Sequence, residues 1–336
     1  MAIESSAQRF IRTLVQCNDS RSKHNNDIFK RCVMMRKRVG IAVLVAAVIG
    51  MTAGFPSLAM GQTEISAAQS QLVVTVEPGA HPAPLLKTND IAVKLDNRPA
   101  DVLNWRLVNG SDPGMQIIFL MDARSRSYLD RRLPSLERFI HALPPSTLVG
   151  VAYMENGSAV MVGPLTTDHA IASKALYAVV PNFSGSPYFC VSSISKHWPS
   201  SKPASSRVIV ILSDGSDPYN SSGVVADPFE EAAIEDAQKA GAIVYAVYVP
   251  EHDYEPLGGE LRMQRLAMHT GGQFYALNDE SPAMFDAFAG DLYQALSRQY
   301  LLTLATPKPG WQRVSVTSKL SSVKVAAPMA VFVAKK

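Results

Sequence analysis

The sequence has 336 residues, of which 47% are hydrophobic and 18% are charged, and its formal net charge is +3. This length and composition are typical of a globular protein with a sizeable core, in one large or two modest domains. The net charge is too small, and too evenly spread, to indicate a nucleic-acid-binding protein.

Residues 1–61 predict a polar leader followed by a secretory signal peptide. A basic Arg-Lys-Arg run precedes an apolar stretch, and the small-x-small sequence Ala59-Met60-Gly61 precedes Gln62 as a cleavage site. We therefore expect an exported protein, located in the periplasm or outside the cell. The alternative is an uncleaved transmembrane helix at 39–58, which would be the chain's contact with a membrane.

Residues 62–112 predict an N-terminal β flank, with short strands at 71–79, 90–97 and 101–108 that are broken by Pro, Gly and Asn. This flank has too little apolar surface to stand alone as a sheet.

Residues 113–299 predict a doubly wound α/β domain. Continuous apolar runs, such as 117–121, are typical of strands that are covered on both faces, and amphipathic helices alternate with them. Strands are expected at 115–123, 147–156, 159–165, 207–215, 242–250 and 273–277, and helices at 133–143, 168–180, 188–198, 227–241, 261–272 and 281–299. This alternation predicts a mostly parallel sheet with helices on both faces.

Residues 300–336 predict a C-terminal β flank with a turn at Lys308-Pro309-Gly310. Like the N-terminal flank, it cannot form a stable sheet by itself. We expect the two flanks to pair with each other into one small β-sandwich beside the α/β domain.

Two of the buried strands are followed by carboxylates. Asp122 follows the strand at 117–121, and Asp214 follows the strand that begins at Arg207. The carboxyl ends of the strands are where open α/β sheets bind ligands. Hard cations there prefer oxygen ligands, yet the positions two and four residues beyond Asp122 are Arg124 and Arg126.

The order of a strand ending in Asp122, a Gly-Ser turn at 185–186 and a strand ending in "LSDGSD" resembles the von Willebrand factor A (VWFA) domain over about 113–299. The mature chain resembles more closely the VWFA-related domain family first defined in acidobacterial genomes. The shared pieces are "LLKTNDIAVKLDNRPADVLNW", the "SDGxD" strand end, a "LAxxTGG" turn at 266–272 and a "RQYLL" segment at 298–302.

The resemblance implies protein binding through a metal-ion-dependent adhesion site. In such a site an Asp-x-Ser-x-Ser loop, a Thr and a second Asp hold Mg²⁺ or Mn²⁺, and an acidic residue of the partner completes the octahedron. The corresponding residues here are Asp122, Ser186 in place of the Thr, and Asp214, with Asp217 close by. The two ligating Ser positions are occupied by Arg124 and Arg126, where the sequence departs from the pattern.

This departure predicts a site without a metal or other cofactor. Two adjacent carboxylates repel each other, and a guanidinium supplies permanent positive charge with a planar donor fork that suits carboxylates. We therefore expect Arg124 or Arg126 to occupy the position of the ion. The alternative is a one-residue slip that turns Ser125 and Ser127 inward. A Mg²⁺ or Mn²⁺ site would then be formed by Asp122, Ser125, Ser127, Ser186 and Asp214.

The sequence gives no positive support for catalysis, since it contains neither a G-x-S-x-G motif nor a phosphate-binding glycine loop. The expected function is an exported protein-binding or scaffolding module, with an unidentified protein partner that binds through an acidic residue. The alternative class is a metal-dependent hydrolase that uses Asp122, Asp214 and Asp217.

Overall fold

A computed structural model describes residues 68–77, 84–109, 113–123, 129–178, 185–220, 227–249, 258–277, 282–306 and 308–335. The predicted leader, cleavage site and alternative anchor at 39–58 lie outside these residues. Within the described residues, no helix is long and apolar enough to cross a membrane.

A six-stranded sheet forms the centre of the α/β part, with the strand order β10-β9-β8-β5-β6-β7. Its strands are β5 (Met115–Met121), β6 (Leu148–Glu155), β7 (Ser158–Met161), β8 (Ser206–Ser213), β9 (Ala242–Tyr248) and β10 (Phe274–Ala276). All neighbouring pairs are parallel except β6 and β7, which form the predicted hairpin at Asn156-Gly157. After β5, the next strands along the chain, β6 and β7, extend the sheet on one side. The following strand, β8, pairs with the other side of β5, and β9 and β10 extend the sheet from there. The order therefore reverses between β5 and β8.

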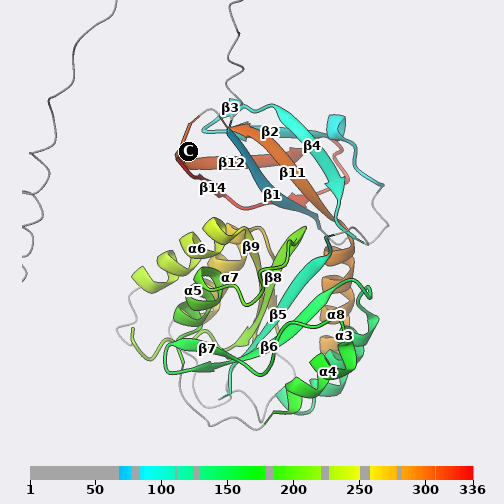
Figure 1. Cartoon of the computed structure of the whole chain (residues 1–336), viewed down its shortest axis with the longest axis vertical. Coiled ribbons are helices and arrows are strands. Elements are labelled where there is room, and N and C mark those ends of the chain that lie inside the picture. The colour runs from blue at the N-terminus through cyan, green and yellow to red at the C-terminus, as the bar shows by residue number, and fades with distance from the viewer. Residues whose placement is uncertain are drawn as a thin grey trace, which may run out of the picture. The chain divides into compact units, whose positions relative to one another are not determined.

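Helices cover both faces of this sheet (Figure 1). One face is covered by α3 (Leu133–Ala142), α4 (His169–Lys174), the 3₁₀ helix η2 (Ala175–Tyr177) and α8 (Pro282–Ser297), and the other by α5 (Pro187–Lys196), α6 (Pro228–Ala240) and α7 (Gly259–Thr270). Within β5, Ile117 and Phe119 pack on the first side, whereas Ile118 and Leu120 pack on the second. A strand buried on both faces requires this continuous apolar run. The predicted doubly wound α/β fold is confirmed.

The two flanks form two four-stranded antiparallel sheets, with the orders β13-β1-β11-β4 and β14-β12-β2-β3. The strands are β1 (Ala68–Val76), β2 (Ile91–Leu95), β3 (Arg98–Pro99), β4 (Val102–Leu107), β11 (Gln299–Thr306), β12 (Gly310–Ser318), β13 (Val325–Ala326) and β14 (Ala330–Val333), and the 3₁₀ helix η1 (Thr88–Asp90) precedes β2. Each sheet contains strands from both flanks, as predicted for the sandwich. On the neighbouring strands β4 and β11 of the first sheet, the rings of Trp105 and Tyr300 stack with centroids 4.5 Å apart.

Specific contacts join the sandwich to the α/β part. The Tyr245 hydroxyl on β9 lies 3.3 Å from Thr75 Oγ1 on β1 and accepts a 3.2 Å hydrogen bond from Gln299 Nε2 on β11. After α7, Gly271 has a φ of +86°, and a Cβ there would lie 2.6 Å from the nitrogen of Pro328. Only glycine permits both this backbone conformation and this close approach. The "TGG" turn is therefore where the C-terminal flank packs against the α/β part.

Candidate functional site

The C-terminal edge between β5 and β8 carries the first of the predicted carboxylates. Asp122 directly follows β5, is 1% exposed, and donates its main-chain N–H to the carbonyl of Leu212 at 3.0 Å. Its Oδ2 accepts a 3.0 Å hydrogen bond from the Ser213 hydroxyl, which in turn accepts one from Gly215 N at 3.1 Å. Asp122 thus ties the end of β5 to the end of β8, at the point where the strand order reverses and where such sheets bind ligands.

Asp214 holds the loop after β8 in a tight turn. Its Oδ1 accepts hydrogen bonds from the Ser216 main-chain N at 2.9 Å and from the Ser216 hydroxyl at 2.6 Å. Gly215 adopts a left-handed conformation with a φ of +70°, and a Cβ there would lie 2.6 Å from the carbonyl oxygen of Gly259. The first residue of α7 therefore rests directly on this loop.

Ser186 and Asp217 are 31 positions apart in the sequence but lie in contact. The Ser186 hydroxyl donates to Asp217 Oδ2 at 3.0 Å and caps α5 by accepting from Phe189 N at 3.3 Å. Asp217 Oδ1 accepts from Tyr219 N at 2.9 Å. Burial raises the pKa of Asp217, and these two hydrogen bonds oppose that rise because they stabilise the ionised form.

The structure therefore places Asp122, Ser186, Asp214 and Asp217 at the same edge of the sheet, all of them buried. The sequence analysis did not foresee that Ser213 and Ser216 bind the two carboxylates, although Ser on either side of Asp in "LSDGSD" is a known source of such turns. Arg124, Ser125, Arg126 and Ser127 lie outside the described residues, so the predicted replacement of the ion by arginine stays a prediction.

The described residues carry only some of the oxygens that a divalent ion would bind, and positions 124–127 lie outside them. Mg²⁺ requires about six oxygen ligands in near-octahedral geometry. At this edge the described residues supply the Ser186 hydroxyl and three carboxylates, those of Asp122, Asp214 and Asp217, and at least one oxygen of each takes part in a hydrogen bond within the protein. Among the described residues there is also no group of three or more His, Cys, Asp or Glu side chains placed to hold a metal.

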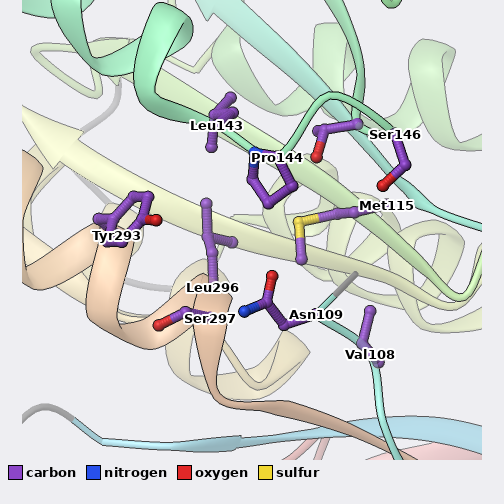
Figure 2. A pocket seen from close by; sticks show the side chains of 10 residues that line it. Val108, Asn109, Met115, Leu143, Pro144, Ser146, Tyr293, Leu296 and Ser297 are labelled. Atoms are coloured by element: carbon purple, nitrogen blue, oxygen red, sulfur yellow. The ribbon is translucent and has the colours of Figure 1, made fainter. Parts of the chain in front are cut away.

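Two hollows of about 380 and 330 Å³ lie away from Asp122, the first lined by β1, β8, the end of α6 and β14, and the second by residues of the sandwich such as Asp96 and Gln312. The cavities at the two edges of the central sheet are much smaller. Figure 2 shows one at the opposite, N-terminal edge of the sheet, where Met115, Leu143 and Leu296 form an apolar wall. Its volume of about 20 Å³ is enough for roughly one water molecule. A second cavity beside Asp122 measures about 10 Å³. Neither accommodates a small-molecule substrate.

The reversal of strand order between β5 and β8 and the helices on both faces define a doubly wound α/β domain with two buried aspartates at the edge where such sheets bind ligands. No protein-family profile matches the sequence, and no curated protein matches it. Similar solved structures include the ArnB paralog VWA2 from Sulfolobus acidocaldarius, which is 11% identical with a TM-score of 0.39, over 79% of this chain and 76% of that one.

Two further similar structures are the SpRpn10 VWA domain and a mussel protein. The first is 12% identical, with a TM-score of 0.37 over 52% of this chain and 92% of that one. The second, proximal thread matrix protein 1 from the mussel byssus, has a zinc-occupied MIDAS motif and is 14% identical, with a TM-score of 0.39 over 56% of this chain and 46% of that one. Because all three TM-scores are below 0.5, the fold is assigned from the strand order and burial of this chain.

Proposed function

We propose that this chain is an exported, non-enzymatic protein-binding module of the VWFA type with a degenerate metal-ion-dependent adhesion site. One observation carries the proposal. Asp122 and Asp214 lie together at the edge where such sheets bind ligands, whereas the two positions that the resemblance assigns to ligating serines are Arg124 and Arg126.

The partner proposed for this site is a protein that presents an acidic side chain. In a metal-loaded adhesion site the ion would attract that carboxylate. Here the positive charge would come from Arg124 and Arg126, because a guanidinium binds a carboxylate through two parallel hydrogen bonds and stays protonated at all physiological pH values. Export is part of the same proposal and rests on the signal-like residues before Gln62.

The response of thermal stability to divalent ions tests the proposal. A ligand that binds only the folded state at 100 times its dissociation constant adds about 2.7 kcal/mol of stability. For a chain of this size that corresponds to a rise in unfolding temperature of roughly 5–10 °C. We expect millimolar Mg²⁺ or Mn²⁺, and likewise EDTA, to leave the unfolding temperature of the wild type unchanged.

The double substitution Arg124→Ser with Arg126→Ser restores the family's loop and should create a metal-dependent rise. Without metal, the same variant should be less stable than the wild type, because Asp122 and Asp214 lose counter-charges. Adding Asp214→Asn to the double variant is the control, since it removes one carboxylate and should abolish the metal response. A clear stabilisation of the unmodified protein by Mg²⁺ would refute the proposal and favour the alternative in which Ser125 and Ser127 are ligands.

A further inference from the structure

A group of buried ionisable side chains, here called the buried charge cluster, extends from Asp217 of the candidate site to residues that the sequence did not indicate. It consists of Asp217 in the loop after β8, Asp227 and Glu230 at the start of α6, and Arg262 in the first turns of α7. Each of these residues is at most 5% exposed. Three acidic side chains and one guanidinium are therefore held together away from water.

Asp227 also stabilises the start of α6. It is the N-cap of α6, and its Oδ1 accepts a 2.8 Å hydrogen bond from Phe229 N. Among the described residues its Oδ2 has no hydrogen-bond partner, and it lies 4.0 Å from Arg262 Nη1. A fully buried carboxylate in this position is costly unless a positive charge compensates it.

Arg262 forms the buried ion pair with Asp227. The neighbouring Arg265 is already paired, with Glu230 Oε2 at 3.1 Å and with Glu231. Arg262 instead lies over the ring of Tyr188, with Cζ 5.8 Å from the ring centroid, and the Tyr188 hydroxyl donates to the carbonyl of Gly215. Arg262 therefore lies between the start of α6 and the loop that carries Asp214.

The interaction of Arg262 with the acids is one of charge. Its Nε and Nη1 have no hydrogen-bond partner in the part of the chain that the structure describes, and 4.0 Å is too long for a direct hydrogen bond to Asp227. The positive charge nevertheless lowers the pKa of Asp217 and of Glu230, and thereby opposes the burial that raises both.

We propose that Arg262 is a positioning residue that acts as the internal counter-charge of the candidate site. From inside the fold its charge compensates the buried carboxylate of Asp227, and it holds the first turn of α7 against the start of α6, beside the loop at 213–217. This role goes beyond the proposed partner binding and depends on neither a metal nor a partner.

A double-mutant cycle between Arg262 and Asp227 tests the proposal. Arg262→Met keeps most of the side-chain volume and removes the charge, and Asp227→Asn removes the charge but keeps a good N-cap. Leaving one member of a buried ion pair uncompensated should lower the unfolding temperature by roughly 10 °C for each single variant. The double variant should lose clearly less than the sum of the two single losses. All measurements are made in EDTA without a partner, so the result is independent of the proposed function.

Two further variants separate charge from packing. Arg262→Lys keeps the charge on a different head group and should recover more than half of the loss caused by Arg262→Met. Arg207→Met removes a part-buried guanidinium at the other end of β8, which donates to the carbonyl of Ala240, and its effect should add to that of Asp227→Asn.

Additive losses for Arg262→Met and Asp227→Asn would overturn the proposal, as would an Arg262→Lys variant as unstable as Arg262→Met. If Arg262→Met does not fold alone, recovery of folding on adding Asp227→Asn supports the proposal, and failure to recover overturns it.

Discussion

Replacing Gly215 by alanine tests whether α7 fixes the loop of the candidate site. The residue has a φ of +70°, which costs an alanine about 1–2 kcal/mol. The added Cβ would also lie 2.6 Å from the oxygen and 2.8 Å from the carbonyl carbon of Gly259. These are backbone atoms at the start of α7, which cannot move aside cheaply, so overpacking adds about 1–3 kcal/mol. The expected loss is therefore about 2–5 kcal/mol.

Gly241 provides a matched control, because it has a φ of +64° and a Cβ there would meet nothing within 4 Å. Gly241→Ala should cost only the backbone term of about 1–2 kcal/mol. Urea unfolding followed by tryptophan fluorescence measures both variants, and the difference between them isolates the contact with Gly259. Equal losses for the two variants would refute the idea that α7 presses on this loop.

Three other outcomes are expected. N-terminal sequencing of the exported protein should find a start near Gln62, whereas recovery of residues 36–61 in a membrane fraction would favour the anchor. Deleting residues 300–336 removes β12, β14 and nearly all of β11, and with them the ring that stacks on Trp105, so the truncated chain should aggregate; a cooperatively folding truncation would contradict this. Burial raises the pKa of Glu230 from 4.5 to about 7, so the folded state binds this proton more tightly than the unfolded chain. The stability gained from protonated Glu230 should therefore be lost as the pH rises from 4.5 through 7, by at most roughly 3 kcal/mol. Urea unfolding should show this loss in the wild type and not in Glu230→Gln.

The α/β part was predictable because its signals are local. The run at 117–121 is apolar at every position, which only a strand covered on both faces requires. Gly241 and Gly271 end α6 and α7 in the left-handed conformation, as glycine after a helical pattern indicates. The pairing of the two flanks was predicted because each flank has too little apolar surface to form a stable sheet by itself. Their register was not predictable, since β1 and β11 meet across more than 220 residues of sequence.

The candidate site was predictable only in part. Asp122 and Asp214 follow apolar runs, so the strand ends place them at one edge. Arg262 gave no such signal. Arg262 lies two and three residues before the polar Gln264 and Arg265 of α7, and an arginine in such a polar helical segment is normally exposed. Its burial depends on how α7 packs against α5 and α6, which is a tertiary effect that local periodicity does not contain.

Positive charge from helix N-termini and from Arg262 offsets the several buried carboxylates at this edge of the sheet. The N-terminus of α5 lies at Asp217 through the Ser186 cap, that of α6 is capped by Asp227, and that of α7 rests on Gly215. Helix N-termini carry partial positive charge, which stabilises carboxylates beside them. Arg262 adds a full positive charge from within the fold. A divalent ion would thus bring further positive charge to an edge where helix N-termini and Arg262 already supply it. This is the physical reason to expect that Mg²⁺ leaves the unfolding temperature of the wild type unchanged.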